Sequence, residues 1–132
     1  MNYITLLKEN NLKATPQRLS IVEELYNHGH MNIDQLYQSM LKKFPSISLA
    51  TIYKNINAMI EICFLSEVKL PNKKSVYELT KQEHSHVVCS KCGEVVDLTL
   101  DKTTLCTQAK QKSDYTLKSS SIVFDGICPS CK

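Results

Sequence analysis

Polar and apolar residues repeat at helical spacing through residues 1–62. The repeat predicts a short helix at about residues 3–9, which ends near a pair of asparagines. Thr15 followed by Pro16 is typical of a second helix start, with threonine as the N-cap and proline in the first turn. Gly29, which stands between two histidines, interrupts the repeat and predicts the end of that second helix.

Two further helices are expected in the same part of the chain. Asn32 and Gln35 have the spacing of a capping box, which predicts a helix that ends near Phe44. Ser48 stands immediately before another apolar repeat. We therefore expect Ser48 to cap a fourth helix.

Short strand-like runs replace the helical pattern after the fourth helix. Residues 64–70 and 75–79 flank the basic, turn-forming segment 71–74, and this arrangement predicts a hairpin. Helices followed by a hairpin favour a winged helix-turn-helix. In that fold the helix from Ser48 would enter the major groove of DNA, and the hairpin would be the wing.

The second half of the chain predicts a separate small unit. Strand patterns and one helical pattern alternate there, at about residues 87–88, 94–100, 103–112 and 117–124. We therefore predict an α+β protein with a winged helix-turn-helix domain and a small α/β domain that carries the cysteines. The expected boundaries are residues 1–80 for the first domain, 81–83 for a hinge and 84–132 for the second domain.

Composition narrows the class of protein. The chain has 132 residues, 42% of them hydrophobic, and a formal net charge of +3. A DNA-binding surface must therefore come from local clustering of basic residues, because the net charge alone is small. The first residues lack the features of a signal peptide, and the apolar runs are too short to cross a bilayer. We expect a cytoplasmic protein with no membrane partner.

Two Cys-x-x-Cys pairs predict a structural zinc site. Cys89 and Cys92 form the first pair, and Cys128 and Cys131 form the second. Two such pairs supply four thiolates, which complete a tetrahedron around Zn²⁺ and leave no open catalytic position. The alternatives are a redox dithiol or buried cysteines without metal, but a redox pair is expected near a βαβ pattern that this sequence lacks.

Two cysteines remain outside these pairs. Cys63 follows the fourth predicted helix, and Cys106 lies in the predicted helix of the second domain. Both are expected to be small buried side chains, since unpaired cysteines are among the most buried residue types.

A second group of candidate metal ligands gives a weaker sequence signal. His84 and His86 lie two residues apart on a predicted strand, so their imidazoles share one face. Glu78 precedes them, and Asp97 follows them. Nitrogen and oxygen donors of this kind suit Fe²⁺, Mn²⁺ or Zn²⁺. The His-x-His pair alone does not distinguish a metal site from two exposed histidines.

Several longer segments together resemble the ferric uptake regulator family of bacterial metalloregulators. They are residues 12–18, His30 with residues 34–37, residues 44–55 and residues 84–93. The resemblance extends over essentially the whole chain. It implies a winged-helix DNA-binding domain, a dimerisation domain, and zinc held by the four paired cysteines.

The same resemblance implies a regulatory metal site that spacing alone does not reveal. The implied ligands, for Fe²⁺ or Mn²⁺, are His30, Glu78, His84, His86 and Asp97. Metal that bridges the two domains would fix the angle between the two recognition helices of a homodimer. Metal concentration would then control binding to operator DNA, because the ion stabilises only the DNA-competent arrangement.

Two carboxylates point to different branches of the family. Asp97 resembles the peroxide-responsive repressors, whereas iron-responsive relatives usually have glutamate at that position. Glu78 resembles the iron-responsive repressors. We favour the peroxide branch, in which His30 and His84 are the oxidation-sensitive ligands. An iron-responsive or a zinc-responsive repressor is the alternative.

Candidate DNA contacts follow from the predicted winged helix and from the resemblance. Tyr53 would meet a thymine methyl group, and the basic and hydroxyl side chains would contact phosphates. The full set is Lys13, Arg18, Ser48, Thr51, Tyr53, Lys54, Asn55, Lys73 and Lys74. The alternatives are that Tyr53 is a core aromatic and that the lysines form a solvated face. The expected partner is double-stranded operator DNA, and a homodimer would read a palindrome.

Functions of other classes explain less of the chain. A non-haem iron enzyme would use the same histidines and carboxylates, but the sequence offers no candidate base beyond the ligands, so we do not expect an enzyme. A zinc-ribbon interaction module would explain only the four cysteines.

One position departs from the family pattern. The family commonly has glycine followed by an aliphatic residue after the recognition helix, and Cys63-Phe64 stands there instead. A cysteine in a left-handed conformation is strained, so we expect a different entry into the wing.

Overall fold

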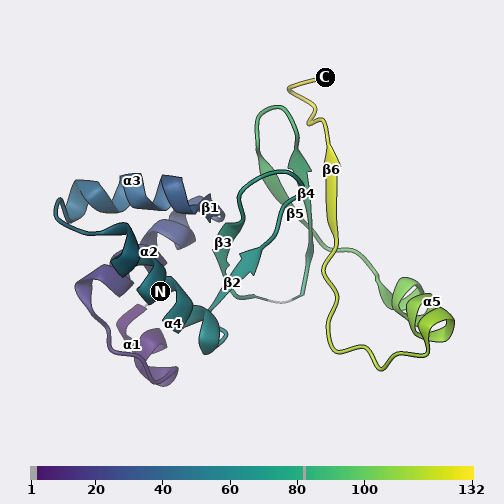
Figure 1. The fold of residues 1–132 in the computed structure, drawn as a ribbon, viewed down its shortest axis with the longest axis horizontal. Helices are drawn as coiled ribbons and strands as arrows, with labels where there is room; N and C mark the ends of the chain where they lie inside the picture. The colour runs from purple at the N-terminus through teal and green to yellow at the C-terminus, as the bar shows by residue number, and fades with distance from the viewer. Residues whose placement is uncertain (1–2, 82) are drawn as a thin grey trace. The chain divides into compact units, whose positions relative to one another are not determined.

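The computed structural model describes residues 3–81 and 83–132 of the chain. Helices and two small sheets make up an α+β fold, which confirms the predicted fold class (Figure 1). The chain divides into two compact units, Met1–Lys81 and Gln82–Lys132. The hinge predicted at residues 81–83 falls at this division, and Gln82 within it lies outside the described residues.

Four helices form most of the first unit. They are α1 (Tyr3–Glu9), α2 (Pro16–His28), α3 (Ile33–Lys43) and α4 (Leu49–Glu61). All four were predicted, because the apolar repeat, the caps and the breaking residues agree along this part of the sequence.

Side-chain caps set the starts of the last three of these helices. Thr15 accepts a hydrogen bond from the backbone N–H of Arg18, and Ser48 accepts one from that of Thr51. Asn32 and Gln35 form a reciprocal capping box, in which both hydrogen bonds measure 2.9 Å. These contacts satisfy N–H groups that have no partner within the helix, and they confirm the three predicted caps.

A three-stranded sheet completes the first unit. Its strands are β1 (Met31–Asn32), β2 (Leu65–Val68) and β3 (Val76–Leu79), in the order β1-β3-β2, and all of them pair antiparallel. The hairpin of β2 and β3 confirms the predicted wing. We did not predict β1, because two residues carry no alternation that a pattern could reveal.

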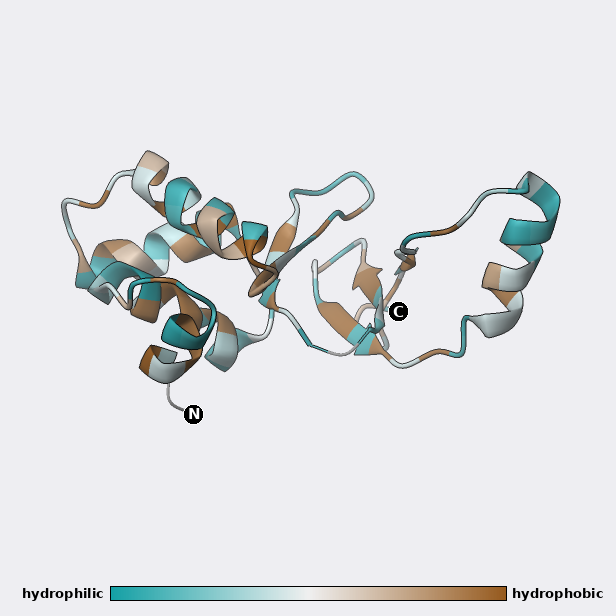
Figure 2. Ribbon diagram, turned by 90° about the horizontal axis from the view of Figure 1, so that it is seen from below, coloured by the Kyte–Doolittle hydropathy of each residue, from teal (hydrophilic) through white to brown (hydrophobic). Residues whose placement is uncertain are grey.

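The helices of the first unit bury one apolar core against this sheet. Ile21, Leu36, Met40, Ile52 and Ile56 are fully buried. Figure 2 shows hydrophobic residues along the sides of the helices that face one another. Burial of each large aliphatic side chain contributes about 1.5–3 kcal/mol. This core fixes α4 against α2 and so positions the predicted recognition helix.

Cys63 has a left-handed backbone, with φ of 63°. The chain therefore turns from α4 into the wing through a conformation that glycine adopts more easily than cysteine. The expected left-handed conformation is present at Cys63, and a different wing entry stays a prediction. The expectation of a buried Cys63 was wrong, because the side chain is exposed at the turn, and Cys106 is only partly buried.

The second unit is built on another three-stranded sheet. Strands β4 (Ser85–Cys89), β5 (Val95–Leu98) and β6 (Val123–Gly126) have the order β5-β4-β6, and α5 (Thr103–Ser113) connects β5 to β6. Strand β5 is antiparallel to β4, and β6 is parallel to it. The prediction of a strand at residues 117–124 was wrong for most of that range. Serines and a lysine interrupt the apolar pattern there, and β6 begins only at Val123.

The two faces of the second sheet differ in chemistry. His86 pairs with Asp97 in register, so imidazole and carboxylate share one face. Val87 pairs with both Val96 and Phe124, which places these three apolar residues on the opposite face. Val96 and Phe124 are 43% and 50% exposed. Helix α5 has no buried residue, and it stands apart from the sheet in Figure 1.

None of the helices in residues 3–81 and 83–132 combines the length and the apolar character needed to cross a membrane.

Candidate metal centres and nucleic-acid interface

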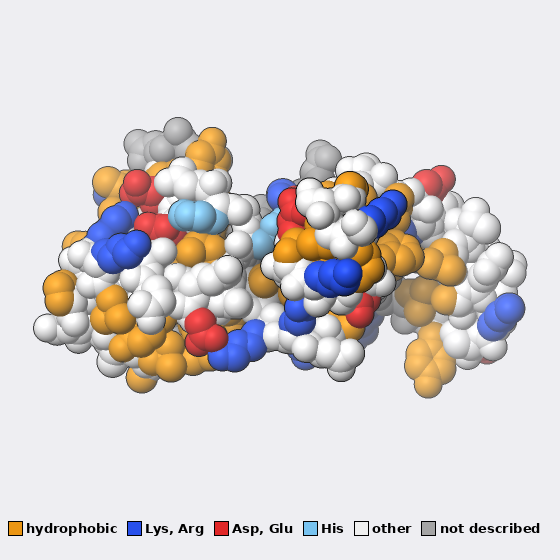
Figure 3. All heavy atoms as spheres, turned by 90° about the horizontal axis from the view of Figure 1, so that it is seen from above, with side chains coloured by type: hydrophobic (Ala, Val, Ile, Leu, Met, Phe, Trp, Pro, Cys, Tyr) orange, Lys and Arg blue, Asp and Glu red, His pale blue; other side chains and the backbone are white. Residues whose placement is uncertain are grey.

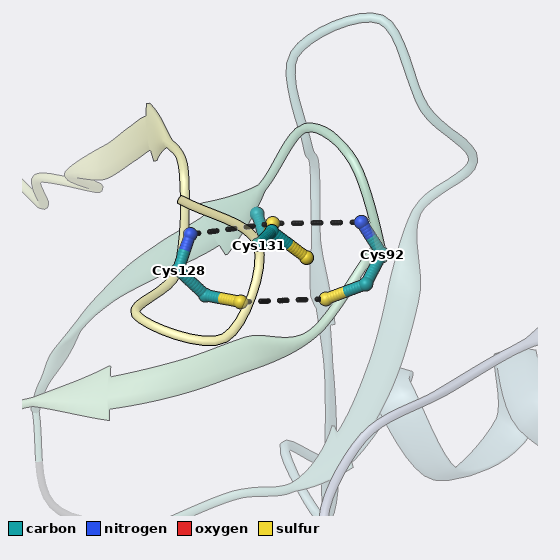
Figure 4. A group of neighbouring side chains, drawn as sticks. Cys92, Cys128 and Cys131 are labelled. Carbon is teal, nitrogen blue, oxygen red and sulfur yellow. Dashed lines mark hydrogen bonds between the residues drawn. The ribbon is translucent and has the colours of Figure 1, made fainter.

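The four paired cysteines lie together in the second unit. Cys89 ends β4, Cys92 lies in the turn that follows, and Cys128 and Cys131 belong to the C-terminal segment after β6. Their Sγ atoms all lie within 4.8 Å of one another. Figure 4 shows the Sγ atoms of Cys92 and Cys128 pointing toward each other across the two segments.

The spacing of these sulfur atoms fits zinc. The Sγ atoms of Cys92 and Cys128 are 3.8 Å apart. A tetrahedral Zn²⁺ ion with Zn–S bonds of about 2.3 Å holds neighbouring sulfurs about 3.8 Å apart. A disulfide requires a separation of about 2.05 Å, and none of the six cysteines forms a disulfide. The four cysteines are therefore a possible zinc site.

Hydrogen bonds around Cys89 prepare a thiolate at this site. The backbone N–H groups of Cys92 and Cys128 both donate to Cys89 Sγ at 3.4 Å. These bonds, that from Cys92 foremost, lower the pKa of Cys89 to about 6. The hydrogen bond with the Cys128 side chain, together with desolvation, raises the pKa of Cys131 to about 12. Crowded thiolates repel one another, and a divalent cation removes that repulsion.

The predicted regulatory ligands fall into two groups, one in each unit. In the first unit, His30 lies between α2 and β1, and Glu78 lies on β3. His30 Nε2 is 2.9 Å from Glu78 Oε2, and the two side chains are only 13% and 4% exposed. Strand β1 pairs with β3 beside them. The short strand that the sequence did not predict therefore holds this pair together.

In the second unit, two predicted histidine ligands approach one carboxylate oxygen of the third predicted ligand, Asp97. Asp97 Oδ1 lies 3.5 Å from His84 Nε2 and 3.4 Å from His86 Nε2. The two imidazole rings stand edge to face, with centroids 4.5 Å apart. Two nitrogens and one oxygen on a single sheet face are suitable donors for Fe²⁺, Mn²⁺ or Zn²⁺.

Comparison with known proteins decides the family. The model of the ferric uptake regulator family matches residues 9–125. The chain belongs to the ferric uptake regulator family.

Among the relatives of this ferric uptake regulator family member is the peroxide-responsive repressor PerR of Staphylococcus epidermidis. The two are 31% identical over 131 residues, which cover 98% of this chain and 87% of that protein. The peroxide stress regulator of Campylobacter jejuni is 38% identical, with a TM-score of 0.72 over 99% of this chain and all of that one. The ferric uptake regulator of Vibrio cholerae is 30% identical, with a TM-score of 0.79 over 96% of this chain and all of that one. The relatives named here are regulators rather than enzymes.

The predicted recognition helix of this family member, α4, exposes several of the predicted DNA contacts. Tyr53 is 38% exposed and does not belong to the buried core, which argues against its alternative role as a core aromatic. Lys54, Ser48 and Thr51 are exposed along the same helix. Asn55 is only partly buried, but its amide forms hydrogen bonds with Arg18 and with the carbonyl of Thr51.

The basic residues outside α4 are arranged less uniformly. Lys13 and Lys73 are exposed. Lys74 Nζ lies 2.5 Å from Asp34 Oδ2, and this hydrogen bond raises the pKa of Lys74. Figure 3 shows lysine and arginine side chains separated by apolar and neutral surface on the face drawn, rather than gathered into one field. This distribution agrees with the small net charge.

The sequence did not predict an ion pair beside His84. Lys102 Nζ lies 2.6 Å from Glu83 Oε1, and Ser120 also donates to that oxygen. The Lys102 side chain is 10% exposed, and it lowers the pKa of Glu83. The two partners are far apart in sequence and belong to no motif, so only the fold brings them together.

Proposed function

We propose that this protein is a metal-dependent, DNA-binding transcriptional repressor that senses peroxide. Membership of the ferric uptake regulator family and the peroxide-responsive relatives support the class. The observation that carries the peroxide branch is the carboxylate of Asp97, which lies within 3.5 Å of both His84 and His86. A cytoplasmic location belongs to the same proposal, because such a repressor must reach the chromosome.

DNA binding is assigned to the first unit. Helix α4 would enter the major groove, where Tyr53 and Lys54 face base edges, and the β2–β3 hairpin would lie along the backbone. The phosphate contacts would come from Lys13, Arg18, Ser48, Thr51, Lys73 and Lys74. The exposure of α4 and its fixed packing on α2 support this assignment.

The regulatory metal is proposed to bind both ligand groups at once. His30 and Glu78 supply one nitrogen and one oxygen from the first unit, and His84, His86 and Asp97 supply the donors of the second. An ion held by both groups stabilises one arrangement of the two units, and its binding free energy is added only to that arrangement. In this way Fe²⁺ or Mn²⁺ would favour the DNA-binding form of a homodimer on a palindromic operator.

Peroxide would act on the imidazole ligands. Fe²⁺ held by these ligands would supply the one-electron chemistry that activates hydrogen peroxide for cleavage of its O–O bond. Overall, a ring C–H bond of His30 or His84 would be replaced by a C–O bond, so that the imidazole gives up the two electrons, one peroxide oxygen enters the ring and the other leaves as water. An oxidised imidazole donates less well to a metal, so the bond between the units is lost and the repressor leaves DNA. Mn²⁺ would support DNA binding without this reaction.

Zinc and a second copy of the chain complete the proposal. The four cysteines would hold Zn²⁺ and fasten the C-terminal segment to the β4–β5 turn, where they would have no catalytic role. The exposed apolar face of the second sheet would pack against the same face of another subunit. A two-fold dimer of this kind places two recognition helices for two half-sites.

An iron-responsive repressor is the second candidate. Glu78 on β3 favours it, and so does the similarity to the ferric uptake regulator of Vibrio cholerae. In that case DNA binding would follow Fe²⁺ alone and would survive peroxide.

One experiment separates the two. An operator duplex is first selected from random DNA with the Mn²⁺-loaded protein. Binding is then titrated with Mn²⁺ or with anaerobic Fe²⁺ before and after a low dose of hydrogen peroxide, and the protein is analysed by mass spectrometry. A peroxide sensor loses DNA only in its Fe²⁺ form and gains one oxygen on His30 or His84. Retention of DNA by the Fe²⁺ form after peroxide would instead identify an iron-responsive repressor.

A further inference from the structure

Asn55 lies on the recognition helix but is turned toward α2. It is partly buried, whereas its neighbours Tyr53 and Lys54 are exposed. Its Oδ1 atom accepts a hydrogen bond from Arg18 Nε at 3.0 Å. Its Nδ2 atom donates to the carbonyl of Thr51 at 3.1 Å. An asparagine that reads adenine must present both its oxygen and its nitrogen to the base edge. Here each end of the amide already has a partner within the protein, and these partners fix its orientation toward α2 rather than toward a base.

Arg18 is held at two points of its guanidinium group. Nε donates to Asn55, and Nη1 donates to the carbonyl of Lys13 at 3.2 Å. The backbone N–H of Arg18 is fixed as well, since it donates to the Thr15 cap. The guanidinium keeps further N–H donors, and their direction is set by these contacts.

The partner of Arg18 in this contact is a neutral amide. A carboxylate at position 55 would also accept the hydrogen bond, but it would cancel the positive charge that attracts phosphate. An amide orients the guanidinium and leaves its full charge available to DNA.

We propose that Asn55 is a positioning residue for Arg18, and that it does not read a base. The hydrogen bond links the phosphate anchor on α2 to the recognition helix α4. The hydrogen bond therefore holds Arg18 on α2 in a fixed position relative to the recognition helix α4. This inference rests on the proposed DNA-binding function, and it predicts that Asn55 contributes to affinity for every sequence equally.

The test compares the selected operator with a scrambled duplex of the same length, using Mn²⁺-loaded protein and fluorescence anisotropy. Asn55→Ala should weaken binding to both duplexes by the same factor, about threefold to tenfold for one hydrogen bond. It should also reduce the dependence of affinity on salt, because one phosphate contact in each subunit is weakened. Asn55→Asp should weaken both complexes further, although it keeps the acceptor oxygen.

A double-mutant cycle supplies the second readout. Asn55→Ala should have little effect when Arg18 is already alanine, because the two side chains act as one unit. Arg18→Lys is a milder variant that keeps the positive charge but lacks the planar guanidinium group with its several N–H donors. It should weaken DNA binding by about as much as Asn55→Ala does. Asn27→Ala, at an exposed position in the last turn of α2, is the matched control and should bind DNA normally. Melting temperatures identify any variant that fails to fold.

The outcomes are distinct. A loss confined to the operator, or one relieved by changing a single base pair, would show that Asn55 reads a base and would overturn the inference. Additive losses in the cycle would overturn it as well. If the unaltered protein bound neither duplex, the repressor proposal itself would fail, and the inference would fail with it.

Discussion

Asp97 Oδ1 lies 3.4 Å from His86 Nε2, and it lies almost as close to His84 Nε2. Their backbones bring them together, because Asp97 on β5 is the register partner of His86 on β4. One carboxylate oxygen thus lies beside two imidazoles, one of which we propose to be the target of peroxide. The length of the side chain at position 97 therefore sets the geometry of this ligand group.

Asp97→Glu is expected to slow peroxide sensing while keeping metal-dependent DNA binding. The longer side chain still supplies a carboxylate, but it moves the oxygen by more than 1 Å, and a misplacement of that size slows a positioned reaction by up to about a hundredfold. The measurement is the rate at which the Fe²⁺ form gains one oxygen, followed by mass spectrometry. Asp101→Glu, an exposed acid of the same unit, is the control and should react at the normal rate. Oxidation of the Asp97→Glu protein at the rate of the unaltered protein would contradict the proposal.

Cys63→Gly is expected to stabilise the first unit. Cys63 has φ of 63°, a conformation that costs an L-residue about 1 kcal/mol more than glycine. Glycine removes this strain but gives the unfolded chain more freedom, so the net gain should be about 0.5 kcal/mol. Urea denaturation measures it.

Cys63→Ala is the matched control for this prediction. Alanine also removes the thiol but retains a Cβ atom, so it should give no gain. If alanine stabilised the protein as much as glycine, the backbone conformation would not be the cause.

The local signals of the first unit made its helices predictable from sequence. Thr15, Asn32 and Ser48 all cap helices as expected, since a cap depends on residues within one turn. Strand β1 and the contact of Arg18 with Asn55 were not predictable in this way. They depend on residues 37 or more positions apart, which only the packed core brings together.

The metal ligands show the same contrast between local sequence signals and contacts of residues far apart in the sequence. The cysteine pairs could be predicted because each Cys-x-x-Cys is local and has one favoured geometry. His30 and Glu78 have no such spacing, and only the resemblance to the family suggested them. Their contact becomes evident once β1 and β3 pair. The strand expected at 117–124 failed because polar residues 118–121 break the apolar alternation.

Loss of zinc is expected to unfold the C-terminal segment of the second unit. The segment after β6 is held to the β4–β5 turn mainly through Cys128 and Cys131, and α5 contributes no buried side chain. Cys131→Ser should therefore lose zinc and increase amide exchange in β4, β5 and β6. Cys106→Ser removes a cysteine outside the cluster, and it should retain zinc and normal exchange. Equal zinc content in both variants would refute the four-cysteine site.

Zinc binding at pH 7 is expected to release fewer than four protons. Cys89 has a pKa of about 6, so it is already mostly thiolate at pH 7 and has little proton to lose. The pKa of Cys131 is raised to about 12, so this thiol must give up a full proton. In the metal-free protein, the lowered pKa of Cys89 stabilises the fold above pH 9 and loses this effect as pH falls to about 6. The effect at Cys131 is opposite, being complete below pH 9 and lost toward pH 12.

Zinc titration of the metal-free protein in weak buffer with a pH indicator measures the proton count. Cys89→Ser removes the group that is already ionised, so the remaining cysteines should release nearly the same number of protons at saturating zinc. Release of four protons at pH 7 by the unaltered protein would show that Cys89 is a thiol and that the N–H bonds of Cys92 and Cys128 do not stabilise its thiolate.

Phe124→Asp is expected to convert the proposed dimer into a monomer. Val96 and Phe124 flank Val87 on one face of the second sheet and are 43% and 50% exposed. Exposed apolar strips of this kind mark interaction sites, because water contact with them is unfavourable. A carboxylate at position 124 would be buried without a partner in the proposed interface, at a cost of several kcal/mol. Sedimentation at micromolar concentration should then give the mass of one chain, and affinity for the selected operator duplex should fall. Asp125→Ala changes the next residue, which lies on the opposite face, and it should leave the dimer intact. A dimeric Phe124→Asp protein would place the interface elsewhere, and the second recognition helix with it.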